Sequence, residues 1–209
     1  MAVLHGRCNV LLSMVMCIAV SRNRTADMND NIKASPELEI IFPSEAIAQR
    51  LGDLAREIAN ERADNLMVVA ILKGSFVFAA DLIRALHGVG LAPEVDFMTL
   101  SSYRKARTSA GQVTILRDMD LDVRGRNVLI IDDVLDSGRT LAFAKDLIAA
   151  RGAKAIKTCV LLDKRAKRAV NIEPDYCAFE CPDTFVVGYG MDVAHRYREL
   201  PFVGRVVRE

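Results

Sequence analysis

Residues 128–141 read VLIIDDVLDSGRTL, the most informative stretch of the chain. The segment begins within a short apolar run, Asn127 to Ile131, which is typical of a strand buried in a sheet. Asp132 and Asp133 follow this run directly, so the strand delivers two adjacent carboxylates to the carboxyl edge of the sheet. Open α/β sheets bind their ligands at that edge. The stretch therefore predicts a polar ligand site.

The turn that follows is suited to a phosphate group. Its residues are small or polar, and their backbone N–H groups and hydroxyls lead into a predicted helix N-terminus: Asp136, Ser137, Gly138, Arg139 and Thr140. Carboxylates beside a phosphate cradle would repel the ligand unless they bind ribose hydroxyls or a bridging divalent cation. The segment therefore indicates a site for a phosphorylated sugar.

Strands and helices alternate along the chain. The apolar run LMVVAIL at 66–72 ends at the turn Lys73-Gly74-Ser75, and a stretch that looks helical follows at 76–87. Such alternation is typical of an α/β fold with a parallel sheet covered by helices. The further elements that we expect are helices at 44–60 and 141–151 and strands at 95–100, 127–131 and 155–162.

Two stretches interrupt this alternation. Residues 103–112, YRKARTSAGQ, are polar, small and basic, and we expect a mobile loop there. The tail from Tyr176 onward contains the short runs YCAFE, FVVGYG and FVGRVV, which we expect to form strands of a small cap beside the sheet.

The N-terminal residues do not follow the pattern of the fold. His5 and Arg7 precede an apolar run, Val10 to Val20, and together they imitate the start of a signal peptide. The run is too short to span a bilayer. For residues 1–27, a dispensable extension, a loosely packed tail and a targeting segment remain open. We expect an N-terminal extension at 1–35 that is disordered or dispensable, followed by one folded domain at 36–209.

The composition argues against several classes of protein. Lys and Arg number 28 and Asp and Glu number 27, so the net charge of +1 provides no overall field toward nucleic acid or an acidic membrane. Five cysteines without a CxxC pair fit poorly with a disulfide framework and indicate reduced thiols in the cytoplasm. With 209 residues, the chain can build one substantial core.

Other readings of residues 128–141 fit less well. The run VLIIDD would also suit the magnesium-binding strand of a nucleotide triphosphatase, but no GxxxxGKS or GxxxxGKT motif accompanies it. Neither Gly88-Val89-Gly90 nor Gly188-Tyr189-Gly190 continues as the GxGxxG of a Rossmann fold. A capped turn without function is the remaining alternative, and three aspartates so close to a buried strand are a poor choice for stability.

Four segments together resemble the type I phosphoribosyltransferases. VLIIDDVLDSGRTL is similar to the signature with which that family binds phosphoribosyl pyrophosphate (PRPP). Three further segments resemble the hypoxanthine-guanine branch in the same order: LKGS at 72–75, SSY at 101–103, and LLDKR at 161–165 followed by PDTFVVGYGMDVAHRYRELPFVG at 182–204. The resemblance covers about residues 38–207. It implies a central, mostly parallel sheet flanked by helices, with a small hood subdomain built from the N- and C-terminal segments of a phosphoribosyltransferase domain at 36–209.

The resemblance implies a set of contacts with PRPP. Asp132 and Asp133 would contact the ribose hydroxyls, directly or through metal, and the stretch from Asp136 to Thr140 would cradle the 5-phosphate. This sequence departs from the family in small ways at Asp132, Arg139 and Val193, where some relatives carry Glu, Lys and an aromatic residue. None of these departures removes a functional group that the chemistry requires.

Further contacts are implied around the pyrophosphate. Lys73 and Gly74 would meet it, with an unusual geometry at the peptide bond before Lys73, and Arg198 would reach it as well. Ser102 and Tyr103 would lie on the loop that closes over the reacting centre.

The resemblance also implies how the purine is bound. Lys164 would donate to the 6-oxo group, Phe185 would stack on the ring, and the backbone of Val186 would face the purine edge. Asp192 would also belong to the purine-binding residues, because the choice of base would depend on backbone positions around Val186 and Asp192. Asp136 is the candidate general base for the proton on N7. Mg²⁺ is the expected cofactor, with ligands from Asp132, Asp133 and Asp192. Residues Arg165, Lys167 and Arg168 are expected to lie on a solvated face.

The implied activity is transfer of ribose 5-phosphate from PRPP to hypoxanthine, and to guanine, in purine salvage. A xanthine-preferring or broad 6-oxopurine enzyme and a PRPP-sensing regulatory protein are the alternatives. The presence of Asp136 and the small net charge favour an enzyme. We expect a cytoplasmic homodimer or homotetramer, with the apolar surface of helix 76–87 as a candidate contact, and no nucleic-acid or membrane partner.

Overall fold

The protein is represented by a computed structural model that describes residues 37–102 and 113–208. The predicted extension at 1–35 and the predicted loop at 103–112, with Tyr103, lie outside the described residues, as does the side chain of Ser102. In chain order the elements are β1 (Glu37–Phe42), α1 (Ser44–Asn60), β2 (Leu66–Leu72), α2 (Phe76–Gly88), β3 (Glu94–Ser102), β4 (Val113–Arg117), β5 (Asn127–Leu135), α3 (Arg139–Ala150), β6 (Ala155–Asp163), β7 (Tyr176–Glu180), β8 (Val186–Val187) and β9 (Val203–Arg208).

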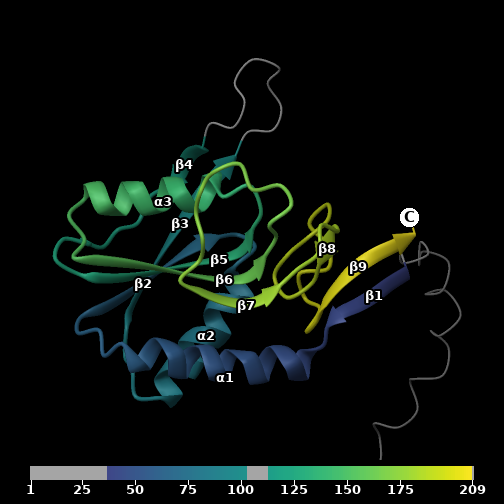
Figure 1. The fold of residues 1–209 in the computed structure, drawn as a ribbon, viewed down its shortest axis with the longest axis horizontal. Helices are drawn as coiled ribbons and strands as arrows, with labels where there is room; N and C mark the ends of the chain where they lie inside the picture. The colour runs from purple at the N-terminus through teal and green to yellow at the C-terminus, as the bar shows by residue number, and fades with distance from the viewer. Residues whose placement is uncertain (1–36, 103–112, 209) are drawn as a thin grey trace, which may run out of the picture. The chain divides into compact units, whose positions relative to one another are not determined.

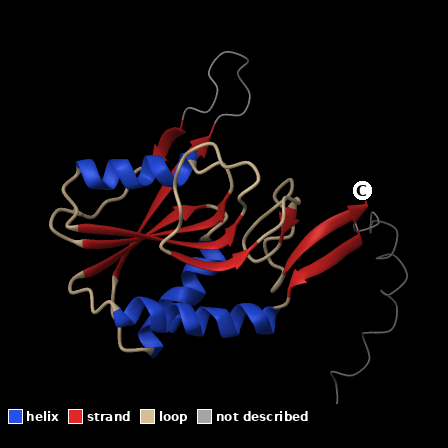
Figure 2. Cartoon of the chain, in the orientation of Figure 1, coloured by secondary structure: helices blue, strands red, loops and turns tan. Residues whose placement is uncertain are grey.

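The main sheet has the strand order β4-β3-β2-β5-β6-β7. All neighbours pair in parallel except β4, which runs antiparallel to β3 at the edge. Helices α1 and α2 cover one face of this sheet and α3 covers the other (Figures 1 and 2). The predicted α/β architecture is confirmed.

Strand β2 is apolar without interruption because both of its faces are buried. Val68 and Ala70 pack into the core that contains Phe78 of α2, whereas Met67 and Val69 pack into the core on the α3 side. Neighbouring side chains of a strand point to opposite faces, so a strand covered on both faces needs apolar residues at every position.

Helix α1 has the predicted bounds. Pro43 precedes it, and its buried residues recur at helical spacing, on the face that packs against the sheet: Ile47, Leu51, Leu54, Ala55 and Ile58. An apolar stripe of this kind is stabilised mainly by the core that it enters.

Three strands differ from what the sequence predicted. The run YCAFE is β7, the edge strand of the main sheet, and not part of the cap. It pairs with β6, and Arg50 of α1 donates hydrogen bonds to the carbonyls of Cys177 and Ala178 at 2.7 and 3.2 Å. Strand β4 was not expected at all. Strand β5 also extends beyond Ile131 to Leu135, so that Asp132 and Asp133 lie within the strand.

A second, smaller sheet has the order β1-β9-β8 and is antiparallel. It joins the start of the folded chain to its end, and an ion pair of 2.6 Å between Arg205 and Glu39 links β9 with β1. The predicted hood of N- and C-terminal segments is therefore confirmed. Within 37–102 and 113–208, none of the helices has the length and apolar character needed to cross a membrane.

Candidate active site

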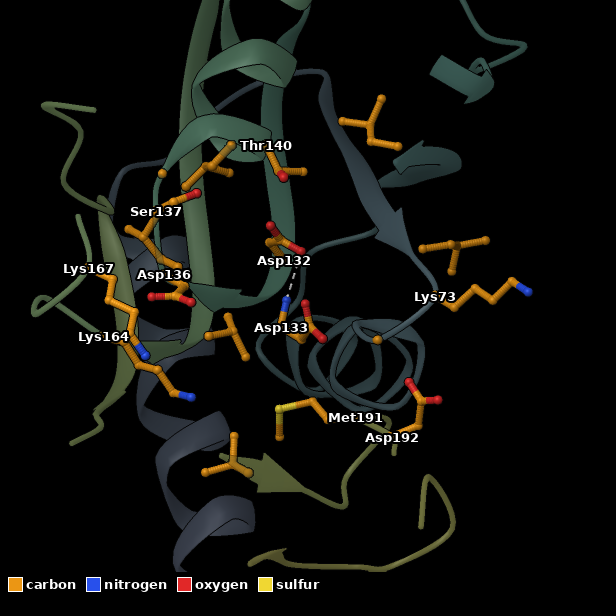
Figure 3. Close-up of a pocket in the computed structure, with 18 of the residues that line it drawn as sticks. Lys73, Asp132, Asp133, Asp136, Ser137, Thr140, Lys164, Lys167, Met191 and Asp192 are labelled. Carbon is orange, nitrogen blue, oxygen red and sulfur yellow. Dashed lines mark hydrogen bonds between the residues drawn. The ribbon is translucent and has the colours of Figure 1, made fainter. Parts of the chain in front are cut away.

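A cavity of about 730 Å³ opens at the carboxyl ends of β2, β5 and β6 (Figure 3). Thirteen of the residues predicted for the site line it: Lys73, Gly74, Asp132, Asp133, Asp136, Ser137, Gly138, Thr140, Lys164, Phe185, Val186, Asp192 and Arg198. Arg139 is exposed and is not among the lining residues. The sheet edge thus gathers residues that lie more than 100 positions apart in sequence.

Two adjacent carboxylates form the centre of the cavity wall. Asp132 is only 6% exposed, and its Oδ1 accepts a hydrogen bond of 3.0 Å from the backbone N–H of Asp133. Burial raises the pKa of Asp132 well above its usual range, and the neighbouring charge of Asp133 raises it further. Burial also raises the pKa of Asp133. The pair is therefore suited to bind a cation or hydroxyl donors.

The turn from β5 into α3 has the geometry of an anion cradle. Gly138 has φ of 82°, in the left-handed region, and a Cβ at this position would lie 2.7 Å from Cγ2 of Ile172. Only glycine adopts this positive φ without strain and has no Cβ to clash with Ile172. Helix α3 begins at the next residue, so its free N–H groups and positive dipole end face the cavity side of the turn.

Asp136 lies at the start of this turn and has an acceptor without a partner. Its Oδ1 atom is buried and, among the described residues, makes no hydrogen bond. Figure 3 places Asp136 on the same side of the cavity as Lys164. A buried acceptor of this kind costs free energy unless a ligand donates a hydrogen bond to it.

Close backbone packing shapes the opposite corner of the cavity. The Leu72–Lys73 peptide bond is cis, which confirms the unusual geometry expected there. A Cβ on Gly74 would lie 1.7 Å from Oδ2 of Asp133, and a Cβ on Gly190 would lie 2.2 Å from the carbonyl oxygen of Gly74. The two glycines therefore allow the loop after β2 to lie directly against the carboxylate.

Arg198 and Asp192 form a pair at this corner. Nη2 of Arg198 lies 2.7 Å from Oδ1 of Asp192, and Nη1 donates to the carbonyl of Gly190 at 2.6 Å. The second carboxylate oxygen of Asp192 accepts from the backbone N–H of His195 at 2.8 Å. Arg198 thus provides positive charge near the cavity but shares it with Asp192.

The other side of the cavity is built for a flat polar ring. Lys164 is buried at the end of β6, and its Nζ donates to the carbonyl of Thr184 at 2.7 Å. An ammonium has three donors, so further donors remain for a ligand. Phe185 is 59% exposed although it is large and apolar, and Val186 beside it is buried. An exposed ring next to a buried lysine fits stacking on a planar ligand better than a role in the core.

Arg168 was expected on a solvated face, and this expectation is wrong. Its side chain is 13% exposed and pairs with the carboxylate of Asp163, which is 1% exposed. Arg165 is exposed as expected, whereas Lys167, also exposed, lines the cavity and pairs with Asp183 at 2.7 Å. The partners of Arg168 include backbone carbonyls of the cavity wall, which no sequence motif identifies.

The three residues predicted to bind Mg²⁺ do not form a preassembled metal centre. In the described part of the chain, no cluster of three or more His, Cys, Asp or Glu side chains is arranged to hold a metal ion. Asp132 and Asp133 nevertheless offer two desolvated carboxylates. Two carboxylates suffice for Mg²⁺ when substrate oxygens and water complete the shell.

Comparison with known proteins defines the class to which this site belongs. The chain is a member of the phosphoribosyl transferase domain family, whose profile matches residues 37–194. This membership confirms the resemblance to the type I phosphoribosyltransferases that the sequence motifs carry.

Within that family the chain is similar to enzymes of one branch. Hypoxanthine phosphoribosyltransferase of Escherichia coli (strain K12) is 42% identical over 173 residues, which are 81% of this chain and 96% of that protein. Hypoxanthine-guanine phosphoribosyltransferase of Bacillus subtilis (strain 168) is 42% identical over 79% of this chain and 91% of that protein. The crystal structure of a hypoxanthine-guanine phosphoribosyltransferase from Bacillus anthracis has a TM-score of 0.77 and 40% identity, over 83% of this chain and 100% of that one.

Proposed function

We propose that this protein transfers the 5-phosphoribosyl group of PRPP to hypoxanthine, and to guanine, and releases pyrophosphate, as an enzyme of purine salvage. The observation that carries this proposal is a single cavity that joins an anion cradle, a buried carboxylate pair and a buried lysine beside an exposed ring. The names of the similar proteins from E. coli and B. subtilis support the same activity.

The proposed substrate position follows the wall of the cavity. The 5-phosphate would lie in the turn from Asp136 to Thr140, and the ribose hydroxyls would donate to Asp132 and Asp133. The pyrophosphate would lie against Lys73, Gly74 and Arg198, where positive charge and backbone N–H groups are available. The participation of Ser102 and Tyr103 in closing the site stays a prediction.

In the proposed reaction, N9 of the purine attacks C1′ of the ribose as the bond between C1′ and pyrophosphate breaks. The electron pair of that bond leaves on the pyrophosphate, and positive charge develops on the ribose ring. Lys73 and Arg198 would stabilise the charge of the leaving group. Asp136 would accept the proton that N7 loses, and its buried Oδ1 without a partner supports this role.

Lys164 would select the base. Its ammonium donates hydrogen bonds and accepts none, so it favours a 6-oxo acceptor over the 6-amino donor of adenine. Phe185 would stack on the ring, and the backbone of Val186 would face the purine edge. The contact of Asp192 with the purine stays a prediction, because Asp192 pairs with Arg198 and lies across the cavity from Lys164 (Figure 3).

Mg²⁺ is the proposed cofactor. When bound, it would neutralise part of the negative charge of the pyrophosphate and make it a better leaving group. Asp132 and Asp133 would hold the ion together with substrate oxygens, and Asp192 would be a weaker ligand because Arg198 already neutralises it.

We further propose that residues 1–35 are dispensable and that the enzymatic domain is 36–209, in a cytoplasmic protein. Removal of residues 1–27 should leave the melting temperature and the rate unchanged, and a large loss of either would contradict the proposal. A homodimer or homotetramer is also proposed, with helix α2, where Phe76 is 44% exposed, as the candidate contact. Light scattering of the full chain tests this.

The direct test of the function is product analysis. Incubation of the protein with hypoxanthine, PRPP and Mg²⁺ should yield IMP and pyrophosphate in equal amounts by mass spectrometry and a coupled phosphate assay. A xanthine-preferring enzyme would instead form XMP much faster than IMP. A regulatory protein would bind PRPP and form no nucleotide.

A further inference from the structure

Arg168 links the two ends of the candidate active site. Its Nε donates to the carbonyl of Asp136 at 3.1 Å, in the turn that forms the anion cradle. Its Nη2 reaches the carbonyls of Leu135 and Lys164, both at 3.4 Å. One guanidinium thus touches the backbone on the phosphate side and on the purine side of the cavity.

A buried carboxylate holds this guanidinium in place. Nη2 of Arg168 pairs with Oδ1 of Asp163, which is 1% exposed at the end of β6, and Nη1 donates to the carbonyl of Ile172. A planar fork with five donors can satisfy several acceptors at once, whereas a lysine ammonium on a flexible stem cannot. The identity of arginine is therefore significant at this position.

The segment that Arg168 anchors also supports the anion cradle from behind. The backbone N–H groups of Ala169 and Val170 donate to the carbonyl of Ser137 at 2.9 and 3.2 Å. Cγ2 of Ile172 lies so close behind Gly138 that a Cβ there would be only 2.7 Å from it. The position of the cradle is thus determined by residues 168–172 as well as by its own strand and helix.

We propose that Arg168, held by Asp163, is a positioning residue that sets the spacing between the anion cradle and Lys164. This inference rests on the proposed function, because a nucleotide would span the cavity with its phosphate in the cradle and its 6-oxo group at Lys164. A loss of this spacing weakens the binding of a whole nucleotide. It leaves pyrophosphate unaffected, because pyrophosphate binds at Lys73 and Gly74, which Arg168 does not contact in the described structure.

Arg165 provides a matched control on the same carboxylate. Its Nε lies 3.1 Å from Oδ2 of Asp163, and its Nη2 lies 3.1 Å from Oε1 of Glu180. Its side chain is 64% exposed, and its partners in the described structure, Asp163 and Glu180, do not include the backbone carbonyls of the cavity wall. Arg165→Lys therefore repeats the chemical change of Arg168→Lys without the contacts to the cavity wall.

The test compares Arg168→Lys, Arg165→Lys and the unmodified protein. In Arg168→Lys, we expect kcat to fall at least about tenfold and the Kd for IMP, measured by calorimetry, to rise about tenfold, since small misplacements of reacting groups cost that much or more. The Kd for pyrophosphate should stay within about twofold, and Arg165→Lys should stay within about twofold in all three quantities. Melting temperatures establish that each variant is folded under the assay conditions.

Two results would overturn the proposal: an Arg168→Lys variant that matches Arg165→Lys, or one that loses affinity for pyrophosphate as much as for IMP. If Arg168→Lys is not folded, Ile172→Ala decides, because it removes the contact behind Gly138 and should weaken IMP but not pyrophosphate. Unchanged IMP affinity in that variant would also overturn the proposal. Failure of the proposed function is distinguishable, since the unmodified protein would then form no IMP.

Discussion

Replacement of Asp132 by asparagine should make the protein more stable and less active. Folding places this carboxyl group, which is 6% exposed, beside the charge of Asp133, and its pKa is raised well above 3.8 as a result. The new amide would still offer an oxygen to the N–H of Asp133, and its NH₂ could donate to the neighbouring carboxylate. The substitution therefore removes an unfavourable charge and keeps the hydrogen bonding.

The size of the gain follows from the cost of burying an ionised group. Mutational data place the cost of burying a neutral polar group at about 1–3 kcal/mol, and an ionised group costs more, so the gain should be at least about 1 kcal/mol. For a protein of this size, each kcal/mol corresponds to about 2–4 °C in melting temperature. The gain should depend on pH. A carboxyl group whose pKa is raised by folding gives full stability below its ordinary pKa of 3.8 and loses it as the pH rises through the raised value. The difference between Asp132→Asn and the unmodified protein should therefore be small near about pH 4 and larger near about pH 8.

The assay is thermal unfolding without ligand at both pH values, combined with kcat/KM for PRPP at saturating hypoxanthine. Asp163→Asn is the matched control, because Asp163 is also a buried aspartate in the main sheet but is paired with Arg168. That control should lose about 3 kcal/mol or more, since one partner of a buried pair is removed. A lower melting temperature for Asp132→Asn at the higher pH, or unchanged kcat/KM, would refute the reasoning.

Three further substitutions test the roles of single residues. Asp136→Asn should lower kcat by about two to four orders of magnitude with PRPP affinity retained, and a variant with the original rate would exclude Asp136 as the base. Lys164→Gln should reduce kcat/KM for hypoxanthine far more than it changes PRPP affinity. It should also reduce the difference in kcat/KM between hypoxanthine and adenine. An unchanged preference for 6-oxopurines would exclude Lys164 as the residue that recognises the base. Gly190→Ala should weaken pyrophosphate binding, because its Cβ would lie 2.2 Å from the carbonyl oxygen of Gly74. Gly88→Ala is the control and should not weaken it, because a Cβ on Gly88 has no atom within 4 Å. Equal effects of the two substitutions on the Kd for pyrophosphate, measured by calorimetry, would contradict this.

Local sequence patterns account for most of the fold. The apolar runs at β2, β5 and β6 and the stripe of α1 predict their elements because a buried strand or a half-buried helix needs those residues at those spacings. The run YCAFE was assigned to the wrong sheet because a five-residue run does not specify which strand it pairs with. That choice depends on β6 and on Arg50, more than 100 residues earlier.

In the candidate site, too, some residues could be predicted from the local sequence, whereas others depend on contacts between distant segments. Asp132, Asp133 and the turn from Asp136 to Thr140 are adjacent in sequence, and their chemistry is unusual enough to be noticed there. Arg168 could not be found in this way, since its charge lies among other basic residues and most of its partners are backbone carbonyls. The orphan acceptor of Asp136 likewise depends on burial, which only the folded chain shows.

The choice of purine tests the central claim most directly. Steady-state rates should be measured with hypoxanthine, guanine, xanthine and adenine, each with PRPP and Mg²⁺. We predict efficient turnover of hypoxanthine, with guanine also a substrate, and a kcat/KM for adenine that is lower by about a thousandfold or more, because a 6-amino donor would face the ammonium of Lys164. Comparable rates with adenine, or no nucleotide with any of the four bases, would contradict the account.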